Sequence, residues 1–518
     1  MGAALRANDT GTETSADTRR VHVAIVGTGF SGIGMAIALK RAGIDDFVLF
    51  ERAGDVGGTW RDNTYPGCQC DVPSHLYSFS FKLNPDWSRT YSPQPEIFEY
   101  LRRCTRETGV MPHIRFNHEV TGAAWSEEDK VWQIETSKGS WIADVCITGN
   151  GGLAEPSIPP IEGIDTFEGS VWHSAAWDHN SEMKGRKVAV IGTGASAIQI
   201  TPRIQPHVKS LHVFQRTPAW VMPHTDRPTR SWERKLYKRL PILQRLVRGG
   251  IYLAREVLVV ALAKNPKLTK PLRAVALRHL RKSIDDPELR RKLRPTYSPG
   301  CKRLLLSNDF YPSLTASNVE LVTEGIESIN ASSIVSRDGT KREVDTIIFA
   351  TGFRVTNNPM MKRIRGRGGR SLAEVWSENG MRAYLGTTVA DFPNLFMLTG
   401  PNTGQGHTSL LVMIEAQIRY VLSGLRLMRD RAVDEVEVRP DVVENFNLRL
   451  QAKMSRTVWT MGGCASWYLD DKGRNTTIWP DFTWRFRRLT ARFDPGDYQL
   501  HTRSRSLDSP DAQSVVSA

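Results

Sequence analysis

The chain has 518 residues, of which 40% are hydrophobic and 24% charged, as is typical of a soluble globular protein with two or three domains. Its net charge of +14 favours anionic ligands or surfaces. Much of this charge lies in one segment, so we do not expect the whole protein to bind nucleic acid. The six cysteines are too few for a disulfide scaffold and include no C-x-x-C pair, which argues against a redox dithiol or a zinc site. We therefore expect a cytoplasmic protein in a reducing environment, with no bound metal.

Both ends of the chain are polar. Residues 1–20 lack the apolar run of a secretory signal, and they predict a disordered lead. Residues 501–518 are rich in Ser and Asp, and they predict a loose tail.

A first glycine-rich turn follows the predicted strand VHVAIV (21–26) and precedes a predicted helix over 31–41. In its G-x-G-x-x-G spacing, the first glycine allows a tight turn, the second lets backbone approach a pyrophosphate, and the third lets the helix pack on the strand. The pyrophosphate would lie at the helix N-terminus. The next predicted strand ends in Glu51, whose carboxylate can accept hydrogen bonds from both ribose hydroxyls. Strand, turn, helix and acid in this order predict a dinucleotide site.

A second turn of this kind, G-x-G-x-x-A, spans 192–197 after the predicted strand RKVAVI. The strand that follows, LHVFQR, ends in Arg216 and Thr217 instead of an acid. An acid would repel a 2′-phosphate, whereas an arginine fork pairs with one, so this site predicts NADPH. The first site, nearer the N-terminus and with Glu51, suits FAD. Together the two sites predict an NADPH-dependent flavoprotein.

Four further segments resemble class B flavoprotein monooxygenases. GGTWRDNTYPGCQCD (57–71) resembles the segment that closes over the flavin, and FEGSVWHSAAWD (167–178) matches the Baeyer–Villiger fingerprint F-x-G-x-x-x-H-x-x-x-W-[PD] at each fixed position. DTIIFATGF (345–353) resembles the end of the nicotinamide domain, and YLGTTVADFPNLFMLTGPN (384–402) resembles the return to the flavin domain. The chain thus resembles the type I Baeyer–Villiger monooxygenases over about residues 20–490.

The resemblance implies a reaction. NADPH would reduce FAD, dioxygen would add to the flavin, and the flavin peroxide would insert oxygen next to a ketone carbonyl to give an ester or lactone. It also places Arg303 at the active-site arginine, which would stabilise the anionic peroxide and polarise the carbonyl, with Asp71 as its acidic partner. Lys302 would face the NADP phosphate. The alternative is that Lys302 and Arg303 only end a basic helical segment.

The resemblance further implies a linker between two domains and a set of cofactor-binding residues. His173 would hold the linker against the nicotinamide domain through hydrogen bonds, not act as an acid–base catalyst, although a histidine between tryptophans also fits a structural core. The linker residues are Phe167, Gly169, His173 and Trp177. The predicted cofactor-binding residues are Gly27, Gly29, Phe30, Ser31, Gly32, Glu51, Arg52, Gly58, Thr59, Trp60, Asp71, Tyr77, Gly192, Thr193, Gly194, Ser196, Ala197, Gln199, Arg216, Thr217, Lys302, Thr351 and Gly352.

These segments predict an α/β fold with two doubly wound, Rossmann-like dinucleotide-binding domains and a helical insertion. The predicted parts are a split FAD domain (21–165 and 391–500), a linker (166–180), an NADPH domain (181–224 and 300–390) and the insertion (225–299). From Asp226 to Arg303 the chain has 22 Lys and Arg against 6 Asp and Glu, which predicts a solvated basic insertion.

One stretch of the insertion allows a second interpretation. Its apolar run IYLAREVLVVALAK (251–264), flanked by arginines, makes a weak membrane-surface contact the alternative. The run is too short, and too interrupted by Arg255, to span a bilayer.

Three other functions stay open on the sequence alone. A sulfide or amine oxygenase of the same flavin class would act on a thioether or amine in place of a ketone. A disulfide reductase would need a dithiol, and Cys68 and Cys70 have the wrong spacing for one. A non-catalytic basic membrane or nucleic-acid binder would hold no flavin. Trp467, Tyr468 and Trp479 fit either a substrate pocket or a core.

Overall fold

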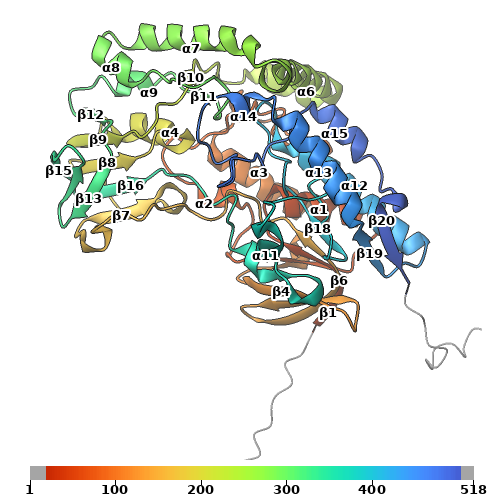
Figure 1. Cartoon of the computed structure of the whole chain (residues 1–518). Coiled ribbons are helices and arrows are strands. Elements are labelled where there is room, and N and C mark those ends of the chain that lie inside the picture. Colours follow the sequence, from red (N-terminus) through yellow and green to blue (C-terminus); the bar gives the residue numbers. More distant parts are fainter. Residues whose placement is uncertain (1–18, 503–518) are drawn as a thin grey trace, which may run out of the picture.

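The computed structural model describes residues 19–502, and these form two large β-sheets with helices packed around them (Figure 1). The first sheet contains parallel and antiparallel pairs, and the second is parallel. The predicted α/β class with two doubly wound units is confirmed. Arg19 and Arg20, which the sequence places in the lead, instead open the first strand, and His501, placed in the tail, closes the last one. Residues 1–18 of the predicted lead and 503–518 of the predicted tail lie outside the described range.

The first sheet has the order β17-β4-β5-β6-β1-β2-β3, with β18 also paired to β6. Its central strands are apolar and buried on both faces, as parallel strands covered by helices must be, whereas β5 alternates between buried and exposed residues because one of its faces meets solvent. The strands are β1 (Arg19–Val26), β2 (Phe47–Phe50), β3 (Ile114–Arg115), β4 (Val120–Ser126), β5 (Val131–Thr136), β6 (Gly139–Thr148), β17 (Ile364–Arg365) and β18 (Leu395–Met397).

The second sheet has five parallel strands in the order β12-β9-β8-β16-β7. The helix α4 (Ala195–Ile204) follows β8 directly, which repeats the strand–turn–helix plan of the first sheet. A three-stranded antiparallel sheet, β13-β14-β15, flanks it. The strands are β7 (Ser170–His173), β8 (Lys187–Ile191), β9 (Ser210–Phe214), β12 (Val319–Val322), β13 (Ile326–Asn330), β14 (Ser333–Ser336), β15 (Lys341–Glu343) and β16 (Thr346–Phe349).

The C-terminal part of the chain returns to the first sheet. The long helix α12 (Leu410–Asp430) packs on α1 (Phe30–Arg41) so closely that a Cβ on Gly34 would lie 2.9 Å from Ile418. In Figure 1, α12 runs beside α13 and α15 along one side of the molecule. The other elements here are α2 (Thr59–Asp62), α3 (Gln94–Glu107), α10 (Met360–Arg363), α11 (Leu372–Ser377), α13 (Pro440–Met454), α14 (Val458–Met461), α15 (Thr483–Leu489), β19 (Glu435–Val438) and β20 (Tyr498–His501).

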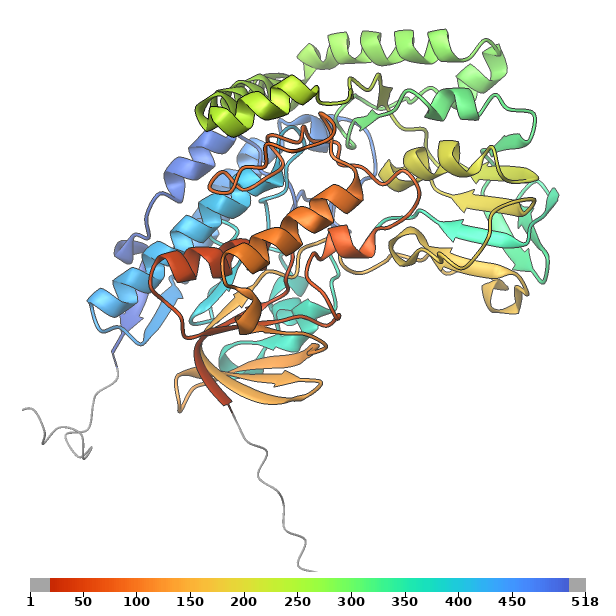
Figure 2. The same cartoon turned by 180° about the vertical axis from the view of Figure 1, so that it is seen from behind.

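A layer of helices lies at the end of the molecule opposite β1 and β4, as both views show (Figures 1 and 2). It is connected to the body by the short pair β10 (Val221–Met222) and β11 (Leu305–Leu306). Among residues 19–502 no helix combines the length and the apolar character needed to cross a bilayer. The helices of this layer are α5 (Ser231–Arg239), α6 (Pro241–Glu256), α7 (Lys270–Ser283), α8 (Pro287–Lys292) and α9 (Phe310–Ser313).

Candidate active site

The first glycine-rich turn joins β1 to α1. Gly27 has φ +96°, a left-handed conformation that favours glycine. A Cβ on Gly32 would lie 1.9 Å from the carbonyl oxygen of Gly27, so only glycine lets α1 begin this close to the turn. Gly29 caps α1 without a side chain, which leaves the first backbone N–H groups of the helix facing the turn. This geometry suits a pyrophosphate.

Glu51 follows β2 and is fixed beside the same turn. Its buried carboxylate accepts hydrogen bonds from the Thr28 hydroxyl at 2.6 Å and from the Ala53 N–H at 3.0 Å. The Arg61 Nη1 lies 2.9 Å from Oε1, the same carboxylate oxygen that accepts from the Ala53 N–H. The predicted ribose-binding acid therefore has a fixed position, held by the turn it is predicted to serve.

Aromatic side chains from the predicted flavin segment pack against this turn. The Trp60 indole N–H donates to the Tyr77 hydroxyl at 3.0 Å, and the Phe30 ring meets Tyr77 edge-on with ring centroids 5.3 Å apart. Burial raises the pKa of Tyr77, so its hydroxyl stays neutral. The rest of the predicted set is nearby: Ser31 is buried in α1, Gly58 and Thr59 form the start of α2, and Arg52 turns outward to pair with Glu155.

The second glycine-rich turn joins β8 to α4 and is more open. Gly192 has φ +117°, and a Cβ there would lie 2.5 Å from the Ala350 carbonyl oxygen. Ala197 occupies the position that Gly32 has in the first turn, and it is buried. A Cβ on Gly194 would meet nothing within 4 Å. The turn thus keeps the tight first glycine but tolerates side chains beyond it.

Two cations lie at the edge of the second turn. The Thr193 hydroxyl donates to the Thr217 carbonyl at 3.2 Å, which fixes the chain as it leaves β9 beside the exposed Arg216. Burial lowers the pKa of Lys302, and the nearby positive charge of Arg216 lowers it further. Neither cation has a carboxylate partner among residues 19–502. Two neighbouring cations that repel each other fit a phosphate group.

Arg303 and Asp71, which the resemblance implies as partners, form a bidentate ion pair. The Arg303 Nε donates to one carboxylate oxygen of Asp71, and a terminal nitrogen donates to the other at 2.6 Å. Burial works against both charges, but the attraction between the partners outweighs it, so the pKa of Arg303 is raised and that of Asp71 is lowered. Both groups are therefore ionised at neutral pH.

The loop of the C-terminal region and a disulfide complete the surroundings of Arg303. Its remaining terminal nitrogen donates to the Gln405 carbonyl at 3.2 Å, and both polar side-chain atoms of Gln405 are buried without a hydrogen-bond partner. Cys301, two residues before Arg303, forms a disulfide with Cys464. This corrects the expectation of cysteines that are all reduced: four others, at 68, 70, 104 and 146, are free.

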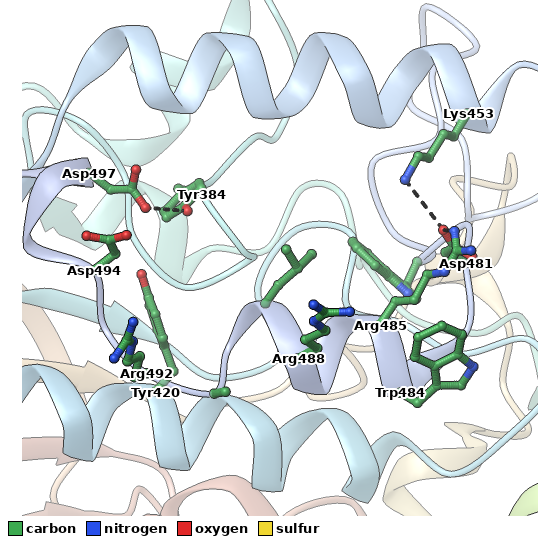
Figure 3. A pocket seen from close by; sticks show the side chains of 13 residues that line it. Tyr384, Tyr420, Lys453, Asp481, Trp484, Arg485, Arg488, Arg492, Asp494 and Asp497 are labelled. Carbon is green, nitrogen blue, oxygen red and sulfur yellow. Dashed lines mark hydrogen bonds and ion pairs between the residues drawn. The ribbon is translucent and has the colours of Figure 1, made fainter.

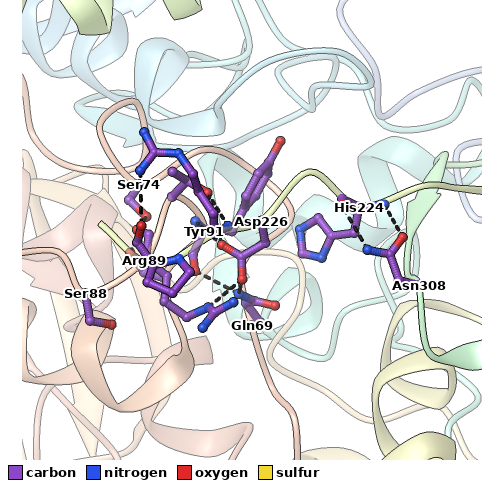
Figure 4. A network of polar contacts seen from close by, with 12 residues as sticks. Gln69, Ser74, Ser88, Arg89, Tyr91, His224, Asp226 and Asn308 are labelled. Atoms are coloured by element: carbon purple, nitrogen blue, oxygen red, sulfur yellow. Dashed lines mark hydrogen bonds and ion pairs between the residues drawn. The ribbon is translucent and has the colours of Figure 1, made fainter. Parts of the chain in front are cut away.

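Asp71 is positioned by contacts between the two folds. Gln199 on α4 accepts a hydrogen bond from the Tyr65 hydroxyl at 3.0 Å and donates to the Gln69 carbonyl at 3.0 Å. Figure 4 shows that Gln69 and Arg89 both reach the carboxylate of Asp226, at 2.9 and 2.6 Å. These contacts fix the segment of Asp71, two residues after Gln69, against the second fold.

Comparison with known proteins agrees with this geometry. The model of the flavin-binding monooxygenase-like family matches residues 20–364. The chain belongs to this family.

A Baeyer–Villiger monooxygenase of Pseudomonas aeruginosa is 49% identical over 94% of this chain and 93% of its own length. The crystal structure of cyclohexanone monooxygenase from Rhodococcus sp. Phi1 bound to NADP⁺ matches with a TM-score of 0.84 and 28% identity, covering 94% of this chain and all of that one. A structure of OTEMO in complex with FAD and NADP matches with a TM-score of 0.83 and 27% identity, over 93% and 99% of the two chains.

In this flavin-binding monooxygenase the predicted linker contains an edge strand. Residues 170–173 form β7 and pair in parallel with β16, so the linker is part of the second sheet at this point. His173 is buried at the end of β7; its Nδ1 accepts from the Ala175 N–H at 3.1 Å, and its ring packs edge-on against Phe353. Burial lowers the pKa of His173. A neutral, buried imidazole is poorly suited to acid–base work. Nε2 of His173 is buried without a hydrogen-bond partner among residues 19–502, so the holding role stays a prediction.

The other linker residues and the last cofactor residues lie on either side of β7. A Cβ on Gly169 would lie 2.4 Å from the Asp345 carbonyl oxygen, so β7 approaches β16 too closely for any other residue. Phe167 packs on one core of the second sheet, whereas Trp177 meets Trp172 edge-on in a core to which both sheets contribute. The remaining predicted residues extend from the second turn: Ser196 is next to Tyr65, Thr351 donates to the Ser157 carbonyl at 2.5 Å, and Gly352 has φ +85°.

The monooxygenase also has a cavity that lies apart from these residues. A cavity of about 800 Å³ is lined by α15 and its neighbours, including Tyr384, Tyr420 and Trp479, and it contains neither Arg303 nor Asp71 (Figure 3). Of the three aromatic residues that the sequence leaves undecided, Trp479 lines this cavity, Tyr468 is buried near Arg303, and Trp467 is largely exposed.

Sequence reasoning missed three residues: Gln405 and Cys464 near Arg303, and Asp226, which binds Gln69 in the segment of Asp71. Gln405 lies in the loop GPNTGQGHTS, whose glycines were a signal for a ligand-facing backbone. Asp226 is the first acid of a strongly basic segment, and that contrast was its only signal. No sequence feature pairs the two cysteines of the disulfide, because 163 residues separate them.

Proposed function

We propose that this protein is an FAD- and NADPH-dependent Baeyer–Villiger monooxygenase that uses O₂ to insert an oxygen atom next to the carbonyl of a small-molecule ketone, giving an ester or lactone. The observation that carries this proposal is the Arg303–Asp71 pair. It holds a permanently charged guanidinium where the segment after the first nucleotide-binding turn meets the second fold.

The residues present fit both cofactors. The Gly27–Gly32 turn, Glu51 and the Trp60–Tyr77 pair would hold FAD, because the turn offers backbone N–H groups and the acid is already fixed for a ribose. The second turn would hold NADPH, with Arg216 and Lys302 at its 2′-phosphate. When bound, FAD accepts a hydride from NADPH and activates O₂.

Arg303 would act on the oxygen of the substrate carbonyl. A guanidinium has five N–H donors. Asp71 uses two and the Gln405 carbonyl uses one, which leaves two for a substrate oxygen. Because the pKa of Arg303 is raised, its charge persists while negative charge develops on that oxygen, and the fixed donors stabilise the tetrahedral oxyanion. Asp71 orients the fork and offsets the cost of its burial.

The reductase alternative loses its chemical basis. Cys68 and Cys70 are buried, free thiols. Burial raises the pKa of Cys68 to about 12, so it is not a thiolate at neutral pH, and thiolate is the species that exchanges with disulfides.

The test is Arg303→Ala in the purified, flavin-loaded enzyme, offered a panel of linear, cyclic and aromatic ketones together with a thioether. We expect FAD to stay bound and NADPH to reduce it at close to the wild-type rate, while ester yield falls by at least about 100-fold because two oxyanion donors and their charge are lost. Products are measured by gas chromatography with ¹⁸O₂ as the oxygen source.

Arg342→Ala is the matched control, since it removes an arginine that is ion-paired with Glu320 in the second fold away from Arg303. It should keep its ester yield. A normal ester yield from Arg303→Ala would refute the assignment of Arg303, and wild-type enzyme that oxygenates the thioether but no ketone would replace the proposed reaction with sulfide oxygenation.

A further inference from the structure

Helix α6 presents a stripe of apolar side chains to solvent. Ile242, Leu246 and Leu253 are 56%, 64% and 65% exposed, and Val257, directly after the helix, is 67% exposed. Their spacings of 4, 7 and 4 residues place all four on one stripe of an α-helix. The apolar stripe therefore faces solvent.

The side of α6 that points into the protein carries hydrogen-bonding side chains beside Ile251 and Tyr252, which pack on the core. The buried amide of Gln244 donates to the Asn84 carbonyl at 2.6 Å. Arg248 donates to three backbone carbonyls of residues 75–78 at 2.9–3.0 Å. Glu256 is buried and accepts from the backbone N–H and hydroxyl of Thr483 at 2.9 and 2.7 Å.

These hydrogen bonds fix the rotation of α6. Turning the helix to hide Leu246 and Leu253 would expose the partners of Gln244 and Glu256 or leave buried polar groups without hydrogen bonds, which is costly. The exposure of the apolar stripe is therefore built into the packing of α6, and some other surface must cover it if it is to be covered at all.

The apolar stripe continues onto neighbouring elements. Ten of the eighteen large hydrophobic side chains that are exposed in residues 19–502 lie between Trp232 and Val275. Trp232 is on α5, Leu268 lies between α6 and α7, and Val275 is on α7. These elements together form one outer edge of the molecule, at the end opposite β1 and β4 (Figures 1 and 2). We call the set from Trp232 to Val275 the insertion edge.

The charge around the insertion edge selects among partners. Residues 231–283 contain 14 Lys and Arg against 2 Asp and Glu. Both acids, Glu233 and Glu256, are buried and bonded within the protein, so the exposed charge of residues 231–283 is positive. Two of the cations, Lys238 and Lys264, are paired with acids of other segments, Asp86 and Asp481. A second copy of this edge would be repelled by the same charge. A nucleic acid would match the charge but leave the large apolar side chains without partners. An anionic bilayer matches both properties, because apolar side chains enter its interface while Lys and Arg meet its head groups.

We propose that the insertion edge is a membrane-docking surface, which binds the interface of an anionic bilayer through the outward stripe of α6 with its flanking cations. The protein then lies on the bilayer without spanning it. This inference does not depend on the proposed reaction, since none of the stripe residues belongs to the candidate active site.

The test is flotation of the flavin-loaded holoenzyme with vesicles of phosphatidylcholine containing about 30% phosphatidylglycerol, at about 50 mM and about 500 mM NaCl, because salt screens the electrostatic part of the attraction. We expect flotation at low salt, at least a several-fold decrease at high salt, and little binding to pure phosphatidylcholine. The triple variant Leu246→Glu, Leu253→Glu and Val257→Glu should reduce binding at least about tenfold, because charged side chains resist burial in the interface.

The matched control is Leu448→Glu with Met461→Glu, which charges two equally exposed hydrophobic side chains outside the insertion edge and should float as wild type. Bound flavin, melting temperature and NADPH oxidation check that each variant is folded. No flotation of wild type at low salt would overturn the proposal. Equal flotation of the triple variant, equal binding to uncharged vesicles, or a wild-type dimer that the triple variant breaks would also overturn it, the last in favour of a second copy.

Discussion

The two glycine-rich turns follow one backbone plan but are constrained in different ways. In the first, the third glycine is required by packing, since a Cβ on Gly32 would meet the Gly27 carbonyl oxygen at 1.9 Å. In the second, Ala197 takes that place and Gly194 has open space around it. Packing thus requires glycine at the third position of the first turn. The second turn has room for a side chain at the corresponding position.

The residues that end the next strand in each fold, Glu51 after β2 and Arg216 after β9, also differ in how firmly they are held. Glu51 is buried and already accepts hydrogen bonds from the residues around its turn. Arg216 is exposed and repels Lys302, so an anion would lower the energy of both cations. A preformed acid suits a nucleotide that stays bound, and a loose cationic pair suits one that binds and leaves.

The largest expected effect tests the steric half of this comparison. Gly32→Ala should destabilise the protein by about 3 kcal/mol or more and abolish flavin binding, because the added methyl group forces α1 away from the turn. Thermal unfolding and the flavin absorbance of the purified protein measure both effects.

Gly194→Ala is the control in the second turn. Gly194 corresponds to Gly29, because Ala197 already stands at the position of Gly32. It should keep the melting temperature within about 2 °C of wild type, since surface changes without clashes usually cost little. If both alanines destabilised the protein equally, the steric distinction between the turns would be wrong.

A smaller effect tests the electrostatic half. Arg216→Glu should raise the KM for NADPH by about 10- to 100-fold, the value of one or two charge-assisted hydrogen bonds, with little change in the KM for NADH. Steady-state kinetics with both nucleotides measures the ratio. Arg203→Glu, an exposed arginine on α4 away from Lys302, is the control. A parallel loss with NADH would indicate general disruption of the turn and not recognition of a phosphate.

How much of this could be predicted from the sequence depends on the range of the contacts. The two turns, Glu51, Arg216 and the fold class were predictable, because strand, glycine spacing and helix are encoded within about 30 residues. The Arg303–Asp71 contact spans 232 positions and came only from the resemblance. The disulfide and the outward stripe of α6 were not predicted in structural terms. Periodicity shows that α6 has an apolar stripe, but it does not show which way the stripe faces. That direction depends on the buried hydrogen bonds of Gln244 and Glu256, whose partners are far away in the sequence.

An effect of similar size concerns the pair that joins the two folds. The pKa of Asp71 is lowered because attraction to Arg303 outweighs the effect of burial, so the carboxylate stabilises the folded state when it is ionised. This contribution is complete above the unfolded pKa of about 4 and is lost as the pH falls through the lower folded pKa. Asp71→Asn should therefore cost about 1–3 kcal/mol at pH 7, the range for a hydrogen bond between charged groups at a partly exposed site.

The difference in unfolding free energy between wild type and Asp71→Asn should stay constant from about pH 7 to 5 and shrink below about pH 4, because wild type then also carries a neutral side chain there. Denaturant unfolding at several pH values measures it, with the exposed Asp285→Asn as a control that should show little difference. A difference that stayed constant down to pH 3 would mean that Asn disturbs packing instead of removing a charge. The two folds would then be joined at this point by shape alone, and the electrostatic account of Arg303 would lose its support.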